Sequence, residues 1–261
     1  MADKYRQKWS REETILAFDL YCRTPFSKIG HTNPDIIELA NMIGRTPGSV
    51  GLKMANLAAC DPEVLGRNLH GMSNGSKLDK EVFEEFAMDW EGLSLLAQEI
   101  KAQYKGVDIS LINPELEIEE LPPGEYREQQ TKVRIGQYFF RTAVLNAYGG
   151  KCCVTGLNDT TLLRASHIKP WSVSNEKTER TNPSNGLCLN SFHDAAFDKG
   201  LITIDKNMII IMSKELLNTN MDPETRTWMM SYAGKQIMLP DKFYPGKEFI
   251  EYHNDVIFKG V

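Results

Sequence analysis

The chain has 261 residues, of which 41% are hydrophobic and 25% are charged, and its formal net charge is −5. No apolar stretch approaches the roughly 20 residues that a membrane-spanning helix needs, so we expect no membrane contact. The polar start MADKYRQKWSREE lacks the apolar core of a secretory signal, which favours a cytoplasmic location. The negative net charge argues against a protein that binds nucleic acid with a basic surface on all sides. A local basic patch is still compatible with this net charge.

The first 105 residues have the signals of a helical domain. Ser10 and Glu13 have the spacing of a capping box, which predicts a helix to about Cys22. A second helix is expected from Asn33-Pro34 to Gly44, and a third from Thr46-Pro47. Residues 79–104 predict one or two further amphipathic helices.

The second and third predicted helices are joined by a very short turn. This spacing is typical of a helix-turn-helix, in which Lys53 could contact DNA. The alternative is a small helical bundle that uses the same turn for packing and touches no nucleic acid. The sequence leaves both interpretations open.

An acidic linker is predicted over residues 106–126. Residues 107–126 contain six acids, three prolines and no base. The next segment reverses this balance, because residues 127–200 contain ten Lys or Arg and six acids, a local balance of +4. The chain should therefore divide into a helical domain over residues 1–105 and a second domain over residues 127–261.

The second domain begins with a predicted helix that Gly149-Gly150 ends. A short strand over Cys152 to Thr155 and a second strand in TLLRASHIKPW are expected next, and Pro170 should end the latter. After a polar loop, Asn185-Gly186 predicts a turn and SFHDAAF one or two helical turns. Residues 202–261 should add strands and helices, with His253 as an ordinary surface residue.

His167, Asn185 and His193 have the order and spacing of the His-Asn-His signature, and the chain thereby resembles the HNH endonucleases. The flanking segments FFRTAVLNAYGGKCCVTG and NGLCLNSFHDAAFDKGLITID are similar to the branch described as predicted restriction endonucleases. The resemblance covers about residues 127–205. It implies an α+β protein in which an N-terminal helical, helix-turn-helix-like domain precedes a C-terminal ββα-metal nuclease domain.

The resemblance also implies a role for each signature residue. His167 would be the general base that takes a proton from water, a task that suits an imidazole with an ordinary pKa near 6.5. Asn185 would fix the geometry that orients this imidazole. His193 would bind a divalent metal ion, most readily Mg²⁺ or Mn²⁺, with Zn²⁺, Ni²⁺ or Co²⁺ as further possibilities.

The chain departs from the family pattern at the metal site. Many relatives have Asp or His directly before the base, whereas this chain has Ser166, a poor metal ligand. The ion would then be held mainly by His193, water and phosphate, or Asp194 or Asp198 would contribute. Asp198 could instead have a structural role in the turn that follows it.

A structural zinc site is not expected, because Leu189 and Phe192 occupy the places of the last cysteine pair in zinc-stapled relatives. With no Cys-x-x-Cys pair in the chain, the cysteines are predicted to be reduced thiols, and Cys152, Cys153 and Cys188 to be buried. Trp171 is predicted to be a core residue.

Four cations of the second domain are candidates for contacts with the DNA backbone, with plain solvation as the alternative for each: Arg134, Arg141, Arg164 and Lys169.

These expectations add up to a metal-dependent endonuclease for double-stranded DNA, with a role in defence as a restriction enzyme. The sequence leaves open whether the enzyme reads modified bases. Cleavage of both strands would favour a homodimer. The rival hypothesis is a DNA-binding regulator with an inactive HNH fold. Single-stranded or structured nucleic acid is a third possible substrate.

Overall fold

The computed structural model of the chain describes residues 7–61, 75–116 and 124–260. The chain forms two compact units. The first contains residues 1–143 and 175–181, and the second contains residues 144–174 and 182–261. No helix in the described part of the chain is both long enough and apolar enough to cross a membrane.

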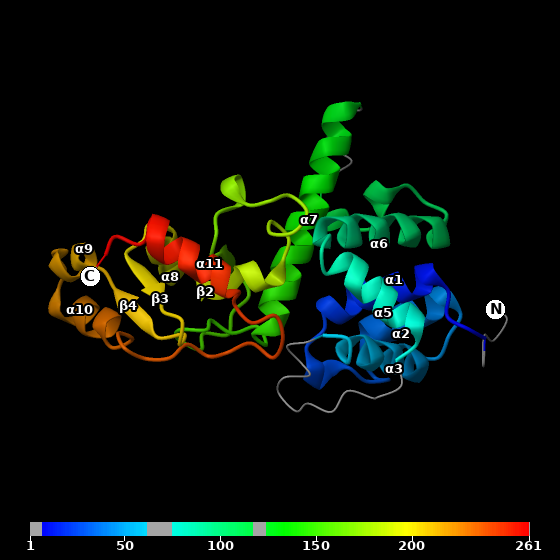
Figure 1. Cartoon of the computed structure of the whole chain (residues 1–261), viewed down its shortest axis with the longest axis horizontal. Helices are drawn as coiled ribbons and strands as arrows, with labels where there is room; N and C mark the ends of the chain where they lie inside the picture. Colours follow the sequence, from blue (N-terminus) through cyan, green and yellow to red (C-terminus); the bar gives the residue numbers. More distant parts are fainter. Residues whose placement is uncertain (1–6, 62–74, 117–123, 261) are drawn as a thin grey trace. The chain divides into compact units, whose positions relative to one another are not determined.

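The first unit is a helical bundle built around one central helix (Figure 1). This helix, α1 (Arg11–Cys22), contacts four helices of the unit, which are α2 (Pro34–Ile43), α3 (Pro47–Ala58), α5 (Lys77–Phe86) and α6 (Trp90–Lys105). Ten of the 12 residues of α1 are buried. The predicted helix starts are confirmed, including the capping box of Ser10 and Glu13.

The predicted turn between α2 and α3 is present, with Gly44 in the left-handed region at a φ of 72°. Lys53, however, is only 4% exposed, and its ammonium forms a buried ion pair with Asp79 and lies 4.8 Å from the centre of the Trp9 ring. Gly48 and Leu52 are the exposed positions of α3, so this helix offers no cation to solvent. The expectation that Lys53 contacts DNA is wrong, because its charge is already neutralised inside the bundle.

Part of the predicted linker adopts regular turns. Short 3₁₀ helices cover Ile109–Leu111 and Pro114–Leu116, while residues 117–123 lie outside the described residues. The long helix α7 (Glu125–Ala147) follows, and the boundary between the two units falls inside it, between Ala143 and Val144.

The second unit contains the predicted strand, loop and helix. Strand β1 (Leu163–His167) pairs antiparallel with β2 (Gly186–Asn190), so that His167 lies opposite Gly186. Helix α8 (Ser191–Asp198) follows β2 directly and contacts both strands. This is a ββα arrangement with His167 at the end of the first strand.

The expected strand over Cys152 to Thr155 is instead a turn. The backbone amide of Gly156 donates to the Cys152 carbonyl at 2.8 Å, which closes the chain on itself and prevents an extended conformation. The Cys153 amide still reaches the middle of the second strand of the sheet, where it donates to the Cys188 carbonyl at 2.7 Å. None of the five cysteines forms a disulfide, and Cys152, Cys153 and Cys188 are buried as predicted.

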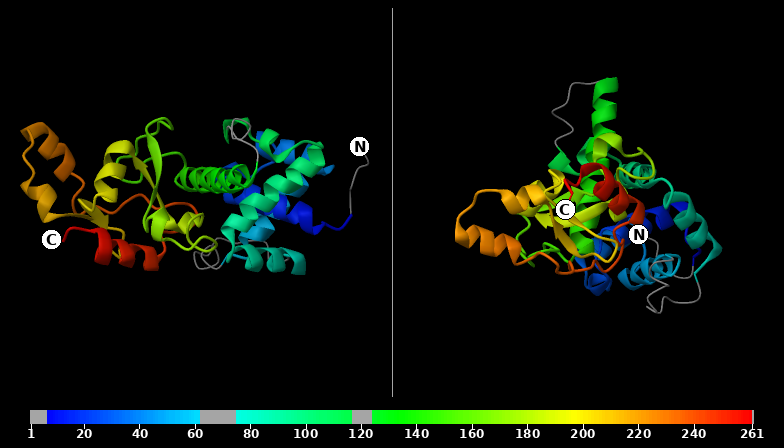
Figure 2. Two further views of the ribbon diagram at one scale, coloured as in Figure 1. Left: turned by 90° about the horizontal axis from the view of Figure 1, so that it is seen from above. Right: turned by 60° about the vertical axis from the view of Figure 1, so that its left-hand side comes forward.

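The C-terminal third completes the second unit. A second antiparallel pair consists of β3 (Ile202–Ile204) and β4 (Ile210–Met212), and it is followed by α9 (Lys214–Asn218), α10 (Pro223–Met230), α11 (Lys247–Tyr252) and a π-helical turn over His253–Ile257 (Figures 1 and 2). Gly200 links α8 to β3 at a φ of 67°, and a Cβ there would lie 2.1 Å from the Ile257 carbonyl oxygen. Glycine at this position therefore lets the C-terminal turn pack against the end of α8.

Candidate active site

A cavity of about 490 Å³ lies in the second unit at the end of β1. It is lined by residues 164–167 of β1, by Pro170 and Trp171, by Asp194 and Asp198 of α8, and by His253 and Ile257. The cavity thus combines one predicted site histidine, two carboxylates and a serine hydroxyl.

His167 is the last residue of β1 and is half-buried at this cavity. Its ring contacts Trp171 edge-on, with ring centres 5.6 Å apart and planes at 87°. Trp171 begins the 3₁₀ turn that directly follows Pro170, so its indole packs beside the imidazole. The prediction that Trp171 is a core residue is therefore wrong. The indole limits the positions that the His167 ring can adopt.

Asn185 is fully buried and braces the chain just beyond His167. Its side-chain oxygen accepts a hydrogen bond from the Lys169 backbone amide at 2.8 Å, and its side-chain nitrogen donates to the Lys169 carbonyl at 3.0 Å. The Ile168 amide also donates to the backbone carbonyl of Asn185, at 2.9 Å. One amide therefore satisfies both backbone groups of a residue two positions after His167, a geometry that supports its predicted positioning role.

Asp194 and Asp198 are four residues apart on α8, so their carboxylates share one face of the helix. Asp194 is half-buried and Asp198 is exposed, and neither forms a salt bridge with a described residue. Partial desolvation and, next, the charge of Asp194 raise the pKa of the Asp198 carboxyl above its ordinary value. The charge of the neighbouring Lys199 opposes this shift without forming a salt bridge, so the two carboxylates at the cavity stay open to a cation.

Ser166 lies beside these acids and is 3% exposed. Its buried hydroxyl has no hydrogen-bond partner that satisfies normal geometry. The hydroxyl is nevertheless close enough to the Asp198 carboxyl to favour its charged form slightly. It is available as a neutral oxygen donor at the cavity wall.

His193 does not line this cavity. It is fully buried, and its ring lies 5.3 Å from the ring centres of both Trp228 and Tyr232. Its Nδ1 is hydrogen-bonded to the Asn190 side-chain oxygen at 3.1 Å, and its Nε2 is buried without a partner. Burial lowers the pKa of His193 to about 4, so the imidazole is neutral at pH 7. The structure brings His167 and Asn185 together, whereas the His193 ring is enclosed by aromatic side chains outside the cavity.

His253, expected at the surface, is 1% exposed. Its ring stacks on Phe197 at 3.8 Å between ring centres, its Nε2 lies 3.1 Å from the Phe197 carbonyl, and its Nδ1 lies 2.8 Å from the Thr203 hydroxyl. Burial lowers its pKa to about 4. The expectation was wrong because the C-terminal turn folds back onto α8.

The predicted phosphate-binding cations lie in different settings. Arg164 is exposed at the cavity and donates to the carbonyls of Thr161 and Leu163. Lys169 is half-buried, with its ammonium 5.4 Å from the centre of the Tyr252 ring. Arg134 and Arg141 belong to the first unit, where Arg134 donates to the Leu116 carbonyl at 2.5 Å. Only Arg164 of this set lines the cavity at His167.

Residues 152–205 match the family model described as HNH endonuclease, and this segment contains the whole ββα arrangement. This segment of the second unit is therefore similar to the HNH endonucleases. No curated protein matches the chain.

The donor set can be compared with what a divalent ion needs. Within residues 7–61, 75–116 and 124–260, no three or more His, Cys, Asp or Glu side chains converge in a way that could hold a metal ion. Mg²⁺, however, is commonly bound by one or two carboxylates, with water and substrate phosphate as its other ligands. The pair Asp194 and Asp198, with the Ser166 hydroxyl beside it, fits this mode of binding. Two acids four residues apart on a predicted helix are a signal that the sequence itself carries, although the family resemblance favours His193 as the ligand.

Proposed function

We propose that the second unit is a metal-dependent endonuclease that hydrolyses phosphodiester bonds in DNA. The observation that carries this proposal is the cavity that His167 shares with Asp194 and Asp198, two carboxylates that form no salt bridge with a described residue, inside the segment that matches the HNH endonucleases.

His167 would act as the general base. Its imidazole lies at the cavity wall, where a water molecule can reach a ring nitrogen, and its neutral form accepts a proton from that water. Trp171 on one side and Asn185 behind the strand would hold the ring in position. Trp171 would limit the freedom of the ring directly, and Asn185 would act through the backbone at Lys169, so that the proton acceptor stays aligned with the attacking water.

Asp194 and Asp198 would hold the ion, with Ser166 or a water molecule between them and β1. When bound, a divalent ion neutralises charge on a phosphate oxygen and on the departing 3′ oxygen. The carboxylate pair favours Mg²⁺ or Mn²⁺, since both ions prefer oxygen ligands. This assignment replaces the His193 ligand that the family resemblance implies, because the His193 ring is enclosed by aromatic side chains.

Arg164 would contact a phosphate of the bound strand, because it is exposed at the same cavity. Contacts from Lys169, Arg134 and Arg141 remain proposals of the same kind. A role in restriction of foreign double-stranded DNA, with a homodimer to cut both strands, is the biological setting that we propose. One active site in each chain would cut one strand, so a monomer would nick and a homodimer would cut both strands.

The rival, a DNA-binding regulator with an inactive HNH fold, is less well supported. It depended on a helix-turn-helix that reads DNA, and the exposed positions of α3 carry no cation. It also depended on Ser166 as a defect of the metal site, whereas the two carboxylates of α8 supply ligands without it.

The proposal is tested with Asp198→Asn, which keeps the size of the side chain and removes its charge. Mn²⁺ binding is measured by electron paramagnetic resonance, and plasmid nicking is measured with Mg²⁺ and Mn²⁺. We expect at least about tenfold weaker Mn²⁺ binding and nicking slowed by about 100-fold. Glu224→Gln, which removes an exposed acid from α10, is the matched control and should match the wild type in both assays. Unchanged Mn²⁺ binding by Asp198→Asn would disprove the assignment of the ion site.

A further inference from the structure

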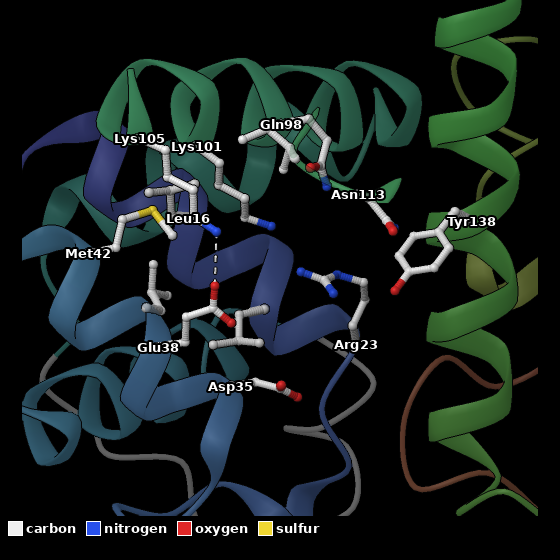
Figure 3. A pocket seen from close by; sticks show the side chains of 13 residues that line it. Leu16, Arg23, Asp35, Glu38, Met42, Gln98, Lys101, Lys105, Asn113 and Tyr138 are labelled. Carbon is white, nitrogen blue, oxygen red and sulfur yellow. Dashed lines mark hydrogen bonds and ion pairs between the residues drawn. The ribbon is translucent and has the colours of Figure 1, made fainter. Parts of the chain in front are cut away.

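The charged groups around a cavity of the first unit are already paired with one another (Figure 3). The cavity has a volume of about 240 Å³ and is lined mainly by α1, α2 and α6. Its Lys101 pairs with Asp19 at 2.8 Å, and its Lys105 pairs with Glu38 at 3.0 Å. Arg23 pairs with Asp19 as well, at 2.5 Å. A charged ligand would have to break these ion pairs, so we assign none to this cavity.

The second unit, in contrast, presents an aromatic cluster to solvent. The cluster consists of Phe192 and His193 of α8, Trp228 of α10, and Tyr232. Phe192 is 50% exposed and Trp228 is 39% exposed, and their ring centres are 5.2 Å apart. They are the two aromatic members among the large apolar side chains exposed in the described part of this unit. A single exposed apolar side chain is ordinary, whereas adjoining ones are a common mark of a binding surface.

His193 fixes the geometry of the cluster from the inside. Its imidazole is fully buried, with its ring centre 5.8 Å from that of Phe192. The same ring centre lies 5.3 Å from those of both Trp228 and Tyr232. Its Nδ1 is hydrogen-bonded to the Asn190 side-chain oxygen, which also caps the first turn of α8. Rings held in this way lose little freedom when a ligand binds, so the cluster is preorganised for a flat partner.

The exposed face of α8 connects the cluster to the candidate active site. Phe192, Ala195 and Lys199 follow the spacing of one helical face, and all three are exposed. Asp198, which lines the candidate cavity, is exposed next to Lys199. Phe192 precedes Asp198 by six residues, or about 9 Å along the helix axis. Because one strand of duplex DNA rises about 3.4 Å per nucleotide, a strand with a phosphate at the candidate site would reach the cluster within a few nucleotides.

Two lysines near the cluster are available to the phosphates of such a strand. Lys199 and Lys235 are exposed, and neither forms a salt bridge with a described residue. The Lys235 ammonium lies 5.9 Å from the centre of the Tyr232 ring, and the charge of Lys199 acts on the neighbouring Asp198. Glu224, an exposed acid one turn before Trp228 on α10, opposes these cations. The phosphates are therefore expected on the Lys199 side of the cluster, towards the candidate site.

We propose that the aromatic cluster stacks on an unpaired nucleobase of the DNA strand that the candidate site would cut. Every base has a flat π face that can stack on an exposed aromatic ring, so the contact needs no particular sequence. Bases inside a duplex are covered by their neighbours, and the cluster can contact one only where the strand is single or a base has left its pair. This inference rests on the proposed nuclease function, because the bound strand is the substrate of that nuclease.

The test is fluorescence anisotropy with the full chain and no divalent metal, so that binding is measured without cleavage. The probes are a labelled oligodeoxythymidylate and an abasic strand of the same length, which keeps the phosphates and lacks the bases. The wild type should bind the intact strand about tenfold more tightly than the abasic strand. Equal binding of the two strands would show that no base is contacted, and the proposal would be wrong.

Variants of Phe192 assign this preference to the cluster. Phe192→Leu keeps an apolar side chain and removes the ring, so it should lose most of the preference for the intact strand. Phe192→Tyr keeps the ring and should retain the preference, as should the control Tyr126→Ala, which removes an exposed aromatic ring from α7. Lys199→Met should weaken binding of both strands alike, because it removes a contact with phosphate.

Three results would overturn the proposal. The first is a Phe192→Leu protein that still prefers the intact strand. The second is an equal loss of affinity for the strand and for its duplex in this variant, which would indicate a contact with something other than an unpaired base. The third is a shift from dimer to monomer in sedimentation with strand binding unchanged, which would make the cluster an interface between copies. A wild type that prefers the intact strand but nicks no DNA would contradict the proposed nuclease function and support the stacking site.

Discussion

Replacing His193 with phenylalanine separates a structural role of this histidine from a metal-binding role. The imidazole is fully buried beside Trp228 and Tyr232, and it makes one side-chain hydrogen bond, to Asn190. A phenyl ring has similar size and suits these aromatic neighbours, whereas it can bind no metal ion. His193→Phe should therefore fold normally.

The effect on stability at pH 7 should be small. The variant loses the Nδ1 hydrogen bond, worth about 1 kcal/mol, and it also removes the buried Nε2 that lacks a partner, a group that costs about 1–3 kcal/mol. The Asn190 side-chain oxygen accepts hydrogen bonds from the backbone amides of residues 192 and 193, at 3.1 and 2.9 Å. Both bonds remain in the variant, so the start of α8 stays capped. These contributions nearly cancel, and we expect a change within about 1–2 kcal/mol.

The effect at lower pH should be large and has a defined sign. Burial lowers the folded-state pKa of His193 to about 4 from an ordinary value of 6.5, so the unfolded chain takes up the proton first. The stability that the neutral imidazole contributes is complete above pH 6.5 and is lost as the pH falls to about 4. Two and a half pKa units correspond to about 3 kcal/mol, at a slope of about 1.4 kcal/mol per pH unit.

The assay is urea unfolding at a series of pH values between 4 and 7, combined with plasmid nicking. Wild-type stability should fall with pH through His193 and His253, whose pKa is also lowered to about 4, and His193→Phe should remove one of these two contributions. Nicking at pH 7 should stay within about threefold of the wild type. A well-folded His193→Phe protein that nicks about 100-fold more slowly would refute this reasoning and return His193 to the metal site.

Three further substitutions test other parts of the structure. Asn185→Ala removes the acceptor of the Lys169 amide, whereas the Lys169 carbonyl keeps the Ser174 hydroxyl at 3.1 Å. Urea unfolding should show a loss of about 1–3 kcal/mol, accompanied by slower nicking, and an unchanged nicking rate would argue against a positioning role. Asp19→Asn leaves Arg23 and Lys101 without their shared counter-ion and should lower the free energy of unfolding by about 3–5 kcal/mol at pH 7. The difference in stability between variant and wild type should narrow as the pH falls from about 4 to about 2, because wild-type Asp19 then becomes protonated. Lys53→Met leaves Asp79 without its ion-pair partner and should lower the free energy of unfolding by about 3–5 kcal/mol in the same assay. DNA affinity in a mobility-shift assay should not change, and a loss of affinity would support the helix-turn-helix hypothesis.

Local signals in the sequence predicted most of the helical unit. Ser10 with Glu13, Asn33 with Pro34, and Thr46 with Pro47 each act within one helical turn, so the cap geometry could be predicted without knowledge of the fold. The burial of Lys53 could not, because its partner Asp79 is 26 residues away and pairs with it only after α3 and α5 pack together. The same local spacing therefore predicted the helices correctly and the exposed face of α3 wrongly.

The candidate site shows the same limit. The resemblance carried by His167, Asn185 and His193 implied a ββα arrangement, but the residues themselves predicted only a turn where β2 lies. The hydrogen bonds of Asn185 follow from the register of the two strands. The environment of His193 depends on α10 and on Tyr232, more than 30 positions further along the chain, and no nearby residue indicates it. The aromatic residues that enclose this ring thus shift the expected ion site to the carboxylates on the other face of α8.

The most direct test of the nuclease account is plasmid nicking by His167→Ala compared with the wild type, in Mg²⁺ and in Mn²⁺. Since Asp194 and Asp198 are intact in this variant, its Mn²⁺ binding should equal that of the wild type. The loss of the general base should slow nicking by about 100-fold or more relative to the wild type. If His167→Ala nicks as fast as the wild type with its Mn²⁺ binding intact, the imidazole at the end of β1 does not activate the water and the account is contradicted.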